Sequence, residues 1–175
     1  EEVKQPFMGY IHLLPPHDPY TTRREFMDHF DDGWVPVIKP QHHFSNDHSE
    51  ESLNQRRLLY DRSIAYVDQE FGRLHQFMTS KGLLDNTIFI LTSDQGEMFE
   101  RGIHGHIGPT LFEPVIHIPL VVSVPGQTKR INVYQPTNAV DGLPTLFQLT
   151  REPIPNWSEG QVLPGIRASD IDNHP

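Results

Sequence analysis

The sequence of 175 residues contains no cysteine, which excludes a disulfide framework, a Cys-ligated zinc site and a cysteine nucleophile within these residues. Basic residues are also scarce, because 14 Lys and Arg face 23 Asp and Glu and leave a formal net charge of −9. A net acidic chain has no long-range attraction for a phosphate backbone, so we expect no nucleic-acid partner.

Long apolar runs are missing as well. None approaches the roughly 20 residues of a membrane-spanning helix, so no membrane span is expected. The first residues show no basic, apolar leader, and the location stays unassigned, with export and a cytoplasmic location both open. The chain is instead rich in turn formers, with 16 Pro and 12 Gly, and several of its 11 His stand beside Gly, Pro or Asp. Histidines on such loops are typical of functional sites as well as of solvated surface.

The pattern of apolar residues indicates an α/β fold. Phe7 to Leu14 predicts a buried strand, with His12 as a hydrogen-bonded core histidine. A helix is expected from Ser49 to about Ser80, with Gly82 as its C-cap. Thr87 to Thr92 predicts a second buried strand. The order strand, helix, strand predicts a mixed, mainly parallel sheet flanked by helices.

Weaker signals fill the remainder. A short helix is expected near 23–30, a loop rich in Gly and His over 98–114, a third strand over 116–124 and a helix over 140–149. One stripe on the long helix recurs at spacings of four and three and predicts its core side: Tyr60, Ile64, Val67, Phe71, Leu74 and Met78. A buried strand so near the first residue needs neighbours, so we expect residues to precede Glu1 and 1–175 to be the C-terminal portion of one domain.

Two candidate site segments follow the predicted strands. Asp94 and Gln95 offer hard oxygens after the second strand, which suits Ca²⁺ or Mg²⁺, although a turn or cap accounts equally well for an aspartate there. His17 lies between prolines and could act as an acid or donor, or could simply bond a loop carbonyl. In open α/β sheets, sites gather beyond the carboxyl ends of strands.

More histidines stand on two further loops. His104 and His106 flank Gly105, where they could donate to sulfate or phosphate oxygens; their spacing is a poor metal-ligand signature. The tract from His42 to His48 could be read as a metal-binding segment, but it lacks a fixed ligand spacing, and we favour a solvated loop.

Five ordered segments carry a more specific signal: Tyr10–Tyr20, Tyr60–Asp68, Asp85–Glu97, Gly105–Leu120 and Val140–Leu146. Their sequences include Pro-His-Asp-Pro-Tyr, Ile-Ala-Tyr-Val-Asp, Thr-Ser-Asp-Gln-Gly-Glu, Leu-Phe-Glu with Ile-Pro-Leu, and Val-Asp-Gly-Leu-Pro-Thr-Leu. In this order and spacing they resemble the C-terminal part of the catalytic domain of sulfatases, which belong to the alkaline phosphatase superfamily. The resemblance covers nearly the whole chain.

The resemblance implies a metal-dependent sulfuric ester hydrolase that acts on the sulfate ester of a small molecule or glycan. It implies that Asp94 is a Ca²⁺ ligand, with Mg²⁺ as an alternative, and that Gln95 supplies an adjacent ligand or a hydrogen bond to it. His17 would contact the sulfate and donate to the leaving oxygen, and His106 would contact the sulfate too. His104 is a weaker candidate for substrate contact.

The chain also departs from the family pattern. Gln95 is one methylene longer than the usual Asn, and His117 stands where Arg is common and is given no role. The family's nucleophile, a Cys or Ser in Cys/Ser-x-Pro-x-Arg that matures to formylglycine, does not occur here, nor does its paired acidic segment. Both are expected in a half that precedes Glu1, so the chain alone is expected to be inactive.

Two alternatives accompany this interpretation. The first is a phosphatase, phosphodiesterase or phosphonate hydrolase of the same superfamily. A formylglycine motif would favour sulfate or phosphonate esters, and a bare Thr or Ser with two-metal ligands would favour phosphoryl transfer. The second is a catalytically dead binding module, which should fold alone and tolerate changes at Asp94, His17 and His106.

Overall fold

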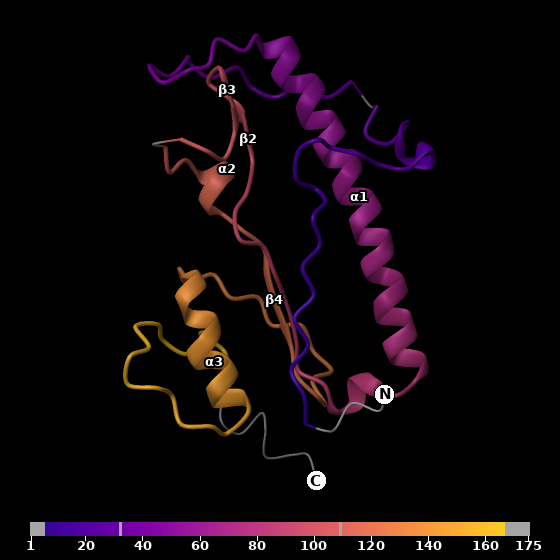
Figure 1. Cartoon of the computed structure of the whole chain (residues 1–175), viewed down its shortest axis with the longest axis vertical. Coiled ribbons are helices and arrows are strands. Elements are labelled where there is room, and N and C mark those ends of the chain that lie inside the picture. Colours follow the sequence, from indigo (N-terminus) through magenta and orange to yellow (C-terminus); the bar gives the residue numbers. More distant parts are fainter. Residues whose placement is uncertain (1–5, 32, 109, 167–175) are drawn as a thin grey trace. The chain divides into compact units, whose positions relative to one another are not determined.

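The computed structural model describes residues 6–31, 33–108 and 110–166 (Figure 1). The chain divides into two compact units. Unit 1 comprises Glu1–His75 with Glu97–Thr110, and unit 2 comprises Gln76–Gly96 with Leu111–Pro175. The elements in chain order are η1 (Arg24–Phe26), α1 (Glu50–Ser80), η2 (Leu83–Asn86), β1 (Phe89–Thr92), β2 (Met98–Glu100), β3 (Ile103–Gly105), α2 (Glu113–Ile116), β4 (Leu120–Ser123), η3 (Ala139–Asp141) and α3 (Gly142–Leu149).

The long helix α1 confirms the strongest local prediction (Figure 1). Its start is capped by Ser49, whose Oγ accepts a hydrogen bond from the Ser52 N–H at 3.2 Å. Glu50 and Glu51 follow in the first turn, where negative charge is favoured by the helix dipole. Gly82 adopts the left-handed conformation with φ 65°, as expected for a residue that ends a helix.

The 21–29 segment packs along the unit 1 part of α1. Thr22 Oγ1 donates to the Arg62 carbonyl at 3.3 Å, and Arg62 Nε donates to the His29 carbonyl at 3.1 Å. The buried Phe26 ring lies 5.9 Å from that of Tyr66. Most of the predicted apolar stripe is half-buried, while Ile64 is exposed. The helix is therefore held by loop contacts as much as by its apolar side.

A hairpin over 98–105 replaces the first part of the loop that the sequence predicts over 98–114. Strand β2 pairs antiparallel with β3, with Phe99 opposite His104. The turn residues Arg101 and Gly102 both have positive φ, 58° and 74°, which is the geometry of a tight two-residue hairpin turn. The common Asn-Gly or Asp-Gly signature is missing here, which is why the sequence pattern did not indicate a hairpin.

The 41–46 loop is hydrogen-bonded to this turn. Ser45 Oγ donates to the Gly102 carbonyl at 3.0 Å, and the Asn46 N–H donates to the same carbonyl at 3.1 Å. A Cβ at Gly102 would lie 2.2 Å from Ser45 Oγ, so no larger residue fits there without movement. The segment that could have been a metal tract therefore packs against the hairpin turn. Among the described residues, no group of three His, Asp or Glu is arranged to hold a metal ion.

Unit 2 contains the second strand pair. Strand β1 pairs antiparallel with β4, with Phe89 opposite Ser123 and Thr92 opposite Leu120. The third strand was expected over 116–124 and instead begins at Leu120, directly after Pro119, because proline cannot donate to a ladder. The side chains of β1 are half-buried, with Thr92 exposed, rather than fully buried as expected.

The prediction of a buried first strand is wrong for the described chain. The 7–14 segment forms no strand, and Met8, Tyr10 and Leu14 are exposed at 76%, 80% and 72%. His12, expected in the core, is also exposed, and its ring nitrogen contacts the Tyr10 hydroxyl at 3.3 Å. A strand needs a hydrogen-bonding neighbour, and none of the described residues pairs with this segment.

The strand–helix–strand crossover is consequently not seen either. Both strand pairs in residues 6–31, 33–108 and 110–166 are antiparallel, and the expected parallel sheet is not found among them. Within the same ranges, every helix is too short or too polar to span a lipid bilayer.

A hydrogen-bond network centred on Asp141 connects the last segments of unit 2. The Asp141 carboxylate accepts from the Asn138 N–H at 2.8 Å and from the Gln161 N–H at 2.9 Å. Buried Thr145 donates to the Asp141 carbonyl at 2.7 Å and accepts from the Leu163 N–H at 2.8 Å. These bonds fix the 160–163 segment against the predicted helix, observed as α3.

The hydrogen-bond network at Asp141 predicts that the stability of the fold depends on pH. The backbone donors of Gln161 and Asn138 lower the pKa of Asp141 below its ordinary value of 3.8. A depressed folded-state pKa stabilises the fold above the unfolded pKa, and that stabilisation disappears as pH falls through the folded value. Asp141→Asn should therefore unfold more easily at pH 7 and lose less stability between pH 5 and pH 2 than the wild type. Urea denaturation across that range measures this, and parallel pH curves for the two proteins would contradict it.

Candidate functional site

Two of the predicted site histidines lie together in unit 1. The rings of His17 and His106 are edge to face, with centroids 5.5 Å apart. They come from segments far apart in sequence, the loop at 15–20 and the residue that follows β3. His17 is exposed and His106 is half-buried, so both can face a ligand that enters from solvent.

Each of these histidines has one ring nitrogen engaged. His17 Nδ1 lies 2.6 Å from the Asp18 carbonyl oxygen, which can only accept, so Nδ1 carries the proton and donates. His106 Nδ1 lies 3.2 Å from Glu97 Oε1. The Glu97 side chain is only 5% exposed, so its carboxylate is shielded from water, and it acts on both His106 and the Tyr20 hydroxyl. Both rings thus keep Nε2 for a ligand.

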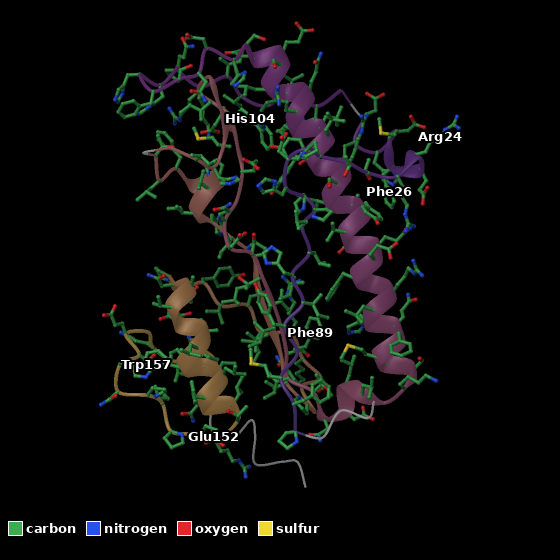
Figure 2. All side chains as sticks on the ribbon, viewed as in Figure 1. Arg24, Phe26, Phe89, His104, Glu152 and Trp157 are labelled. Carbon is green, nitrogen blue, oxygen red and sulfur yellow. The ribbon has the colours of Figure 1, made fainter. Side chains whose placement is uncertain are left out.

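His104 lies in a different environment from His106. His104 stands on β3 and is labelled in Figure 2. Its Nε2 is 2.7 Å from the buried Tyr20 hydroxyl. Its ring packs 5.5 Å from Phe99 and 5.9 Å from Tyr20, and Tyr20 in turn packs 5.5 Å from Tyr60. The Tyr20 contact uses Nε2, which leaves Nδ1 as the ring nitrogen that could reach a substrate.

Burial keeps this cluster uncharged. Desolvation, followed by the negative charge of Glu97, raises the pKa of the Tyr20 hydroxyl well above its usual range. Burial also raises the pKa of Tyr60. Burial, followed by the Arg56 guanidinium, lowers the pKa of His104. A neutral phenol and a neutral imidazole therefore share the hydrogen bond between Tyr20 and His104 near pH 7.

Asp94 and Gln95 lie in unit 2, directly after β1. Asp94 is exposed, and its Oδ1 accepts the Gln95 N–H at 2.9 Å. The next residue, Gly96, donates to the Val115 carbonyl at 2.8 Å, and a Cβ there would lie 2.0 Å from the Pro114 carbonyl oxygen. The loop after β1 can lie this close to α2 only because position 96 has no side chain.

The side-chain oxygens of Asp94 and Gln95 are of the chemical type that hard cations bind. One carboxylate and one amide are the donor types that Ca²⁺ and Mg²⁺ prefer. Calcium takes six to eight oxygens, and among the residues with described positions no cluster of three ligand-type side chains completes such a shell. Asp94 and Gln95 can therefore supply a part of a metal site, and the amide reaches further than the usual Asn would.

Sequence reasoning missed the two groups that hold the histidines in place, Tyr20 and Glu97. Both residues stand inside quoted segments, at the ends of Pro-His-Asp-Pro-Tyr and Ser-Asp-Gln-Gly-Glu. Each segment is recognisable by itself. The partners are not, because Tyr20 meets a residue 84 positions away and Glu97 meets one 9 positions away across the hairpin.

We expect the Tyr20–His104 hydrogen bond to contribute measurably to the free energy of unfolding. Tyr20→Phe leaves a half-buried ring nitrogen without its partner, and we expect a loss of about 1–2 kcal/mol in the free energy of unfolding. Tyr66→Phe is the matched control, since the Tyr66 ring lies 4.9 Å from the Arg23 guanidinium and its hydroxyl makes no hydrogen bond within the described ranges. Urea denaturation compares the two, and equal effects would rule out a specific role for the Tyr20 hydroxyl.

Comparison with known proteins identifies the family. The Sulfatase family model matches residues 1–152. The chain is 29% identical over 185 residues to a choline-sulfatase of Rhizobium meliloti, which covers 93% of this chain and 36% of that protein. It is 31% identical over 106 residues to an N-acetylglucosamine-6-O-sulfatase of Bacteroides thetaiotaomicron, covering 59% of this chain and 19% of that protein.

A solved structure shares the fold. The phosphonate monoester hydrolase SpPMH from Silicibacter pomeroyi superposes with a TM-score of 0.73 at 23% identity, covering 91% of this chain and 36% of that one. The chain thus spans about a third of the length of the choline-sulfatase and of this hydrolase. With the family model matching most of its residues, the chain belongs to the sulfatase family.

Proposed function

We propose that this chain is the C-terminal portion of the catalytic domain of a metal-dependent sulfatase, which hydrolyses the sulfate ester of a small molecule or glycan. The observation that carries the proposal is the pairing of His17 with His106, the latter backed by the nearly buried Glu97 carboxylate. Two imidazoles with engaged Nδ1 atoms present their Nε2 atoms as a pair of groups suited to the oxygens of a tetrahedral anion.

In this proposal His17 and His106 perform different tasks. His17, in its doubly protonated form, keeps its Nδ1–H on the Asp18 carbonyl and transfers the Nε2 proton to the alcohol oxygen as the S–O bond breaks, which leaves a neutral ring. His106 donates through Nε2 to a sulfate oxygen. A ring that donates through both nitrogens is an imidazolium, and the Glu97 carboxylate is placed to accept from that cation.

Asp94 would hold a Ca²⁺ ion, with Mg²⁺ as the alternative, and Gln95 would add a ligand or a hydrogen bond to one. When bound, such an ion would supply positive charge to anionic ligand oxygens. The other ligands and the nucleophile, a formylglycine in this family, would come from the two thirds of the relatives' length that this chain does not span. The same part would complete the mainly parallel sheet.

The alternative function is hydrolysis of a phosphate or phosphonate ester at the same site. It is supported by the fold shared with a phosphonate monoester hydrolase. Cations and hydrogen-bond donors stabilise a sulfate and a phosphonate group equally well, so only a comparison of the two substrates distinguishes these functions.

The test measures hydrolysis by the intact protein of 4-nitrophenyl sulfate and of 4-nitrophenyl phenylphosphonate. We expect the sulfate ester to have the higher kcat/KM. EDTA should abolish the activity and Ca²⁺ should restore it, because the metal neutralises developing charge. Asp94→Asn should lower kcat/KM by at least about a hundredfold.

Asp85→Asn serves as the control for Asp94→Asn, since Asp85 is an exposed carboxylate of the same unit. It should leave kcat/KM within twofold. Faster phosphonate hydrolysis would replace the proposed function by its alternative. Activity that survives both EDTA and Asp94→Asn would remove the metal from the proposal.

The Glu97–His106 pair gives a second test. Glu97→Gln keeps the shape but weakens the hydrogen bond to the His106 imidazolium, and we expect kcat to fall about tenfold or more. Glu113→Gln is the matched control, because Glu113 contacts His117 at 3.5 Å in a pair that is 82% and 78% exposed. Steady-state kinetics with thermal melting separates catalysis from folding. If both variants keep the wild-type kcat, Glu97 does not act through His106.

A further inference from the structure

Glu97 is a nearly buried carboxylate with two hydrogen-bonding neighbours. The first is His106, whose Nδ1 lies 3.2 Å from Glu97 Oε1. The second is the Tyr20 hydroxyl. Burial and the charges of Glu97 and Asp18 raise the pKa of this hydroxyl, and a side-chain hydrogen bond to Glu97 adds to that rise. Since the Glu97 side chain is only 5% exposed, water has little access to its oxygens.

The Tyr20 hydroxyl connects this carboxylate to a second histidine. Its oxygen lies 2.7 Å from His104 Nε2, and the two rings are edge to face with centroids 5.9 Å apart. A Cβ at Gly105 would lie 3.7 Å from Glu97 Oε1, so the backbone between His104 and His106 passes directly beside the carboxylate. His106, Glu97, Tyr20 and His104 therefore form one continuous chain of polar groups, all within unit 1.

The donors and acceptors of this chain determine the direction of its hydrogen bonds. A carboxylate only accepts, so His106 Nδ1 and the Tyr20 hydroxyl both donate to Glu97. A phenol has a single proton, so the Tyr20 oxygen accepts from His104, which carries its proton on Nε2. Burial, followed by the Arg56 guanidinium, lowers the pKa of His104, so its ring is neutral near pH 7 and its Nδ1 is unprotonated.

We propose that Tyr20 and His104 are positioning residues that act on His106 through the Glu97 carboxylate. The inference rests on the proposed function, in which His106 contacts the sulfate. The Tyr20 hydroxyl holds the carboxylate so that it stays on His106 Nδ1, and His106 keeps Nε2 for a sulfate oxygen. Because His104 donates to the Tyr20 oxygen, the Tyr20 proton stays on Glu97. His104 thus acts from behind Glu97 and does not contact the substrate.

This arrangement acts on the rate of the reaction more than on the affinity for substrate. A donor that is oriented before the substrate binds needs no reorganisation when charge develops in the transition state. Loosening Glu97 lets the His106 ring turn, and a displacement of about 1 Å lowers a rate by up to roughly a hundredfold. Loss of the Tyr20 or His104 contact should therefore lower kcat and leave KM nearly unchanged.

The first measurement determines the tautomer of His104 directly. Nitrogen NMR spectra of the intact protein, labelled with ¹⁵N in histidine, distinguish a protonated ring nitrogen from an unprotonated one, and the spectrum of His104→Gln identifies the His104 signals. We expect a proton on Nε2 of His104 and none on its Nδ1 near pH 8. A proton on Nδ1 instead would mean that Tyr20 donates to His104 rather than to Glu97, and would overturn the proposal.

The second measurement is steady-state kinetics of the intact protein with 4-nitrophenyl sulfate. Tyr20→Phe should lower kcat by roughly tenfold and leave KM within twofold. Tyr60→Phe is the matched control and should keep kcat within twofold. The Tyr60 ring packs in the same cluster, 5.5 Å from Tyr20 and 5.3 Å from Phe99, while its hydroxyl makes no hydrogen bond to a residue in the described ranges.

Two substitutions of His104 separate positioning from substrate contact. His104→Leu removes the donor and should lower kcat as much as Tyr20→Phe does. His104→Gln should restore most of kcat, because its amide nitrogen can donate to the Tyr20 oxygen in place of Nε2. Thermal melting of each variant separates these effects from a loss of folding. If His104→Leu does not fold, the tautomer of wild-type His104 and the kcat of Tyr20→Phe still decide.

Equal losses of kcat in Tyr20→Phe and Tyr60→Phe would overturn the proposal, because the cluster would then act only through stability. A raised KM with unchanged kcat in both His104 variants would overturn it too, since His104 would then contact the substrate. Either result leaves the proposed function intact. An intact protein that does not hydrolyse the sulfate ester would overturn the proposed function, and the His104 tautomer would still decide the direction of the hydrogen bonds.

Discussion

The hydrogen bond between the Tyr20 hydroxyl and His104 Nε2 is the contact on which the arrangement of unit 1 depends. It joins two residues 84 positions apart, one after the His17 loop and one on β3. The rings of Tyr60 and Phe99 enclose it, so it is shielded from water and both partners stay neutral. Because the loop is tied to the hairpin at this point, His17 and His106 meet on the same side.

The residues around that hydrogen bond form two groups, those that hold the segments in position and those that are proposed to contact a ligand. Tyr20, His104 and Glu97 are buried or half-buried and bond to one another or to His106, whereas Nε2 of His17 and of His106 has no hydrogen-bond partner in the described part of the chain. The support is built from the same segments that carry the candidate chemistry, each residue within three positions of a site histidine or of Asp94. This explains why the family segments read as compact motifs although their partners are remote in sequence.

The sequence predicts those features of the fold that depend on interactions between neighbouring residues. The N-cap at Ser49, the left-handed Gly82 and the helix over 140–149 follow from rules about single turns. The pairing of strands did not follow, since the apolar 7–14 segment has no partner among the described residues and the 98–105 hairpin turns on an unusual Arg-Gly pair. The site residues His17, His106, Asp94 and Gln95 were nominated from motifs, while the supports at Tyr20 and Glu97 required the fold.

The proposed function depends most on the histidine pair of unit 1, His17 with His106. A crystal structure of the intact protein grown with Ca²⁺ and sulfate tests this most directly. We expect a sulfate with oxygens at hydrogen-bond distance, about 2.7–3.2 Å, from Nε2 of both His17 and His106, and a Ca²⁺ ion bound by Asp94. A cation bound elsewhere while Asp94 faces solvent, or a sulfate held away from both histidines, would contradict it.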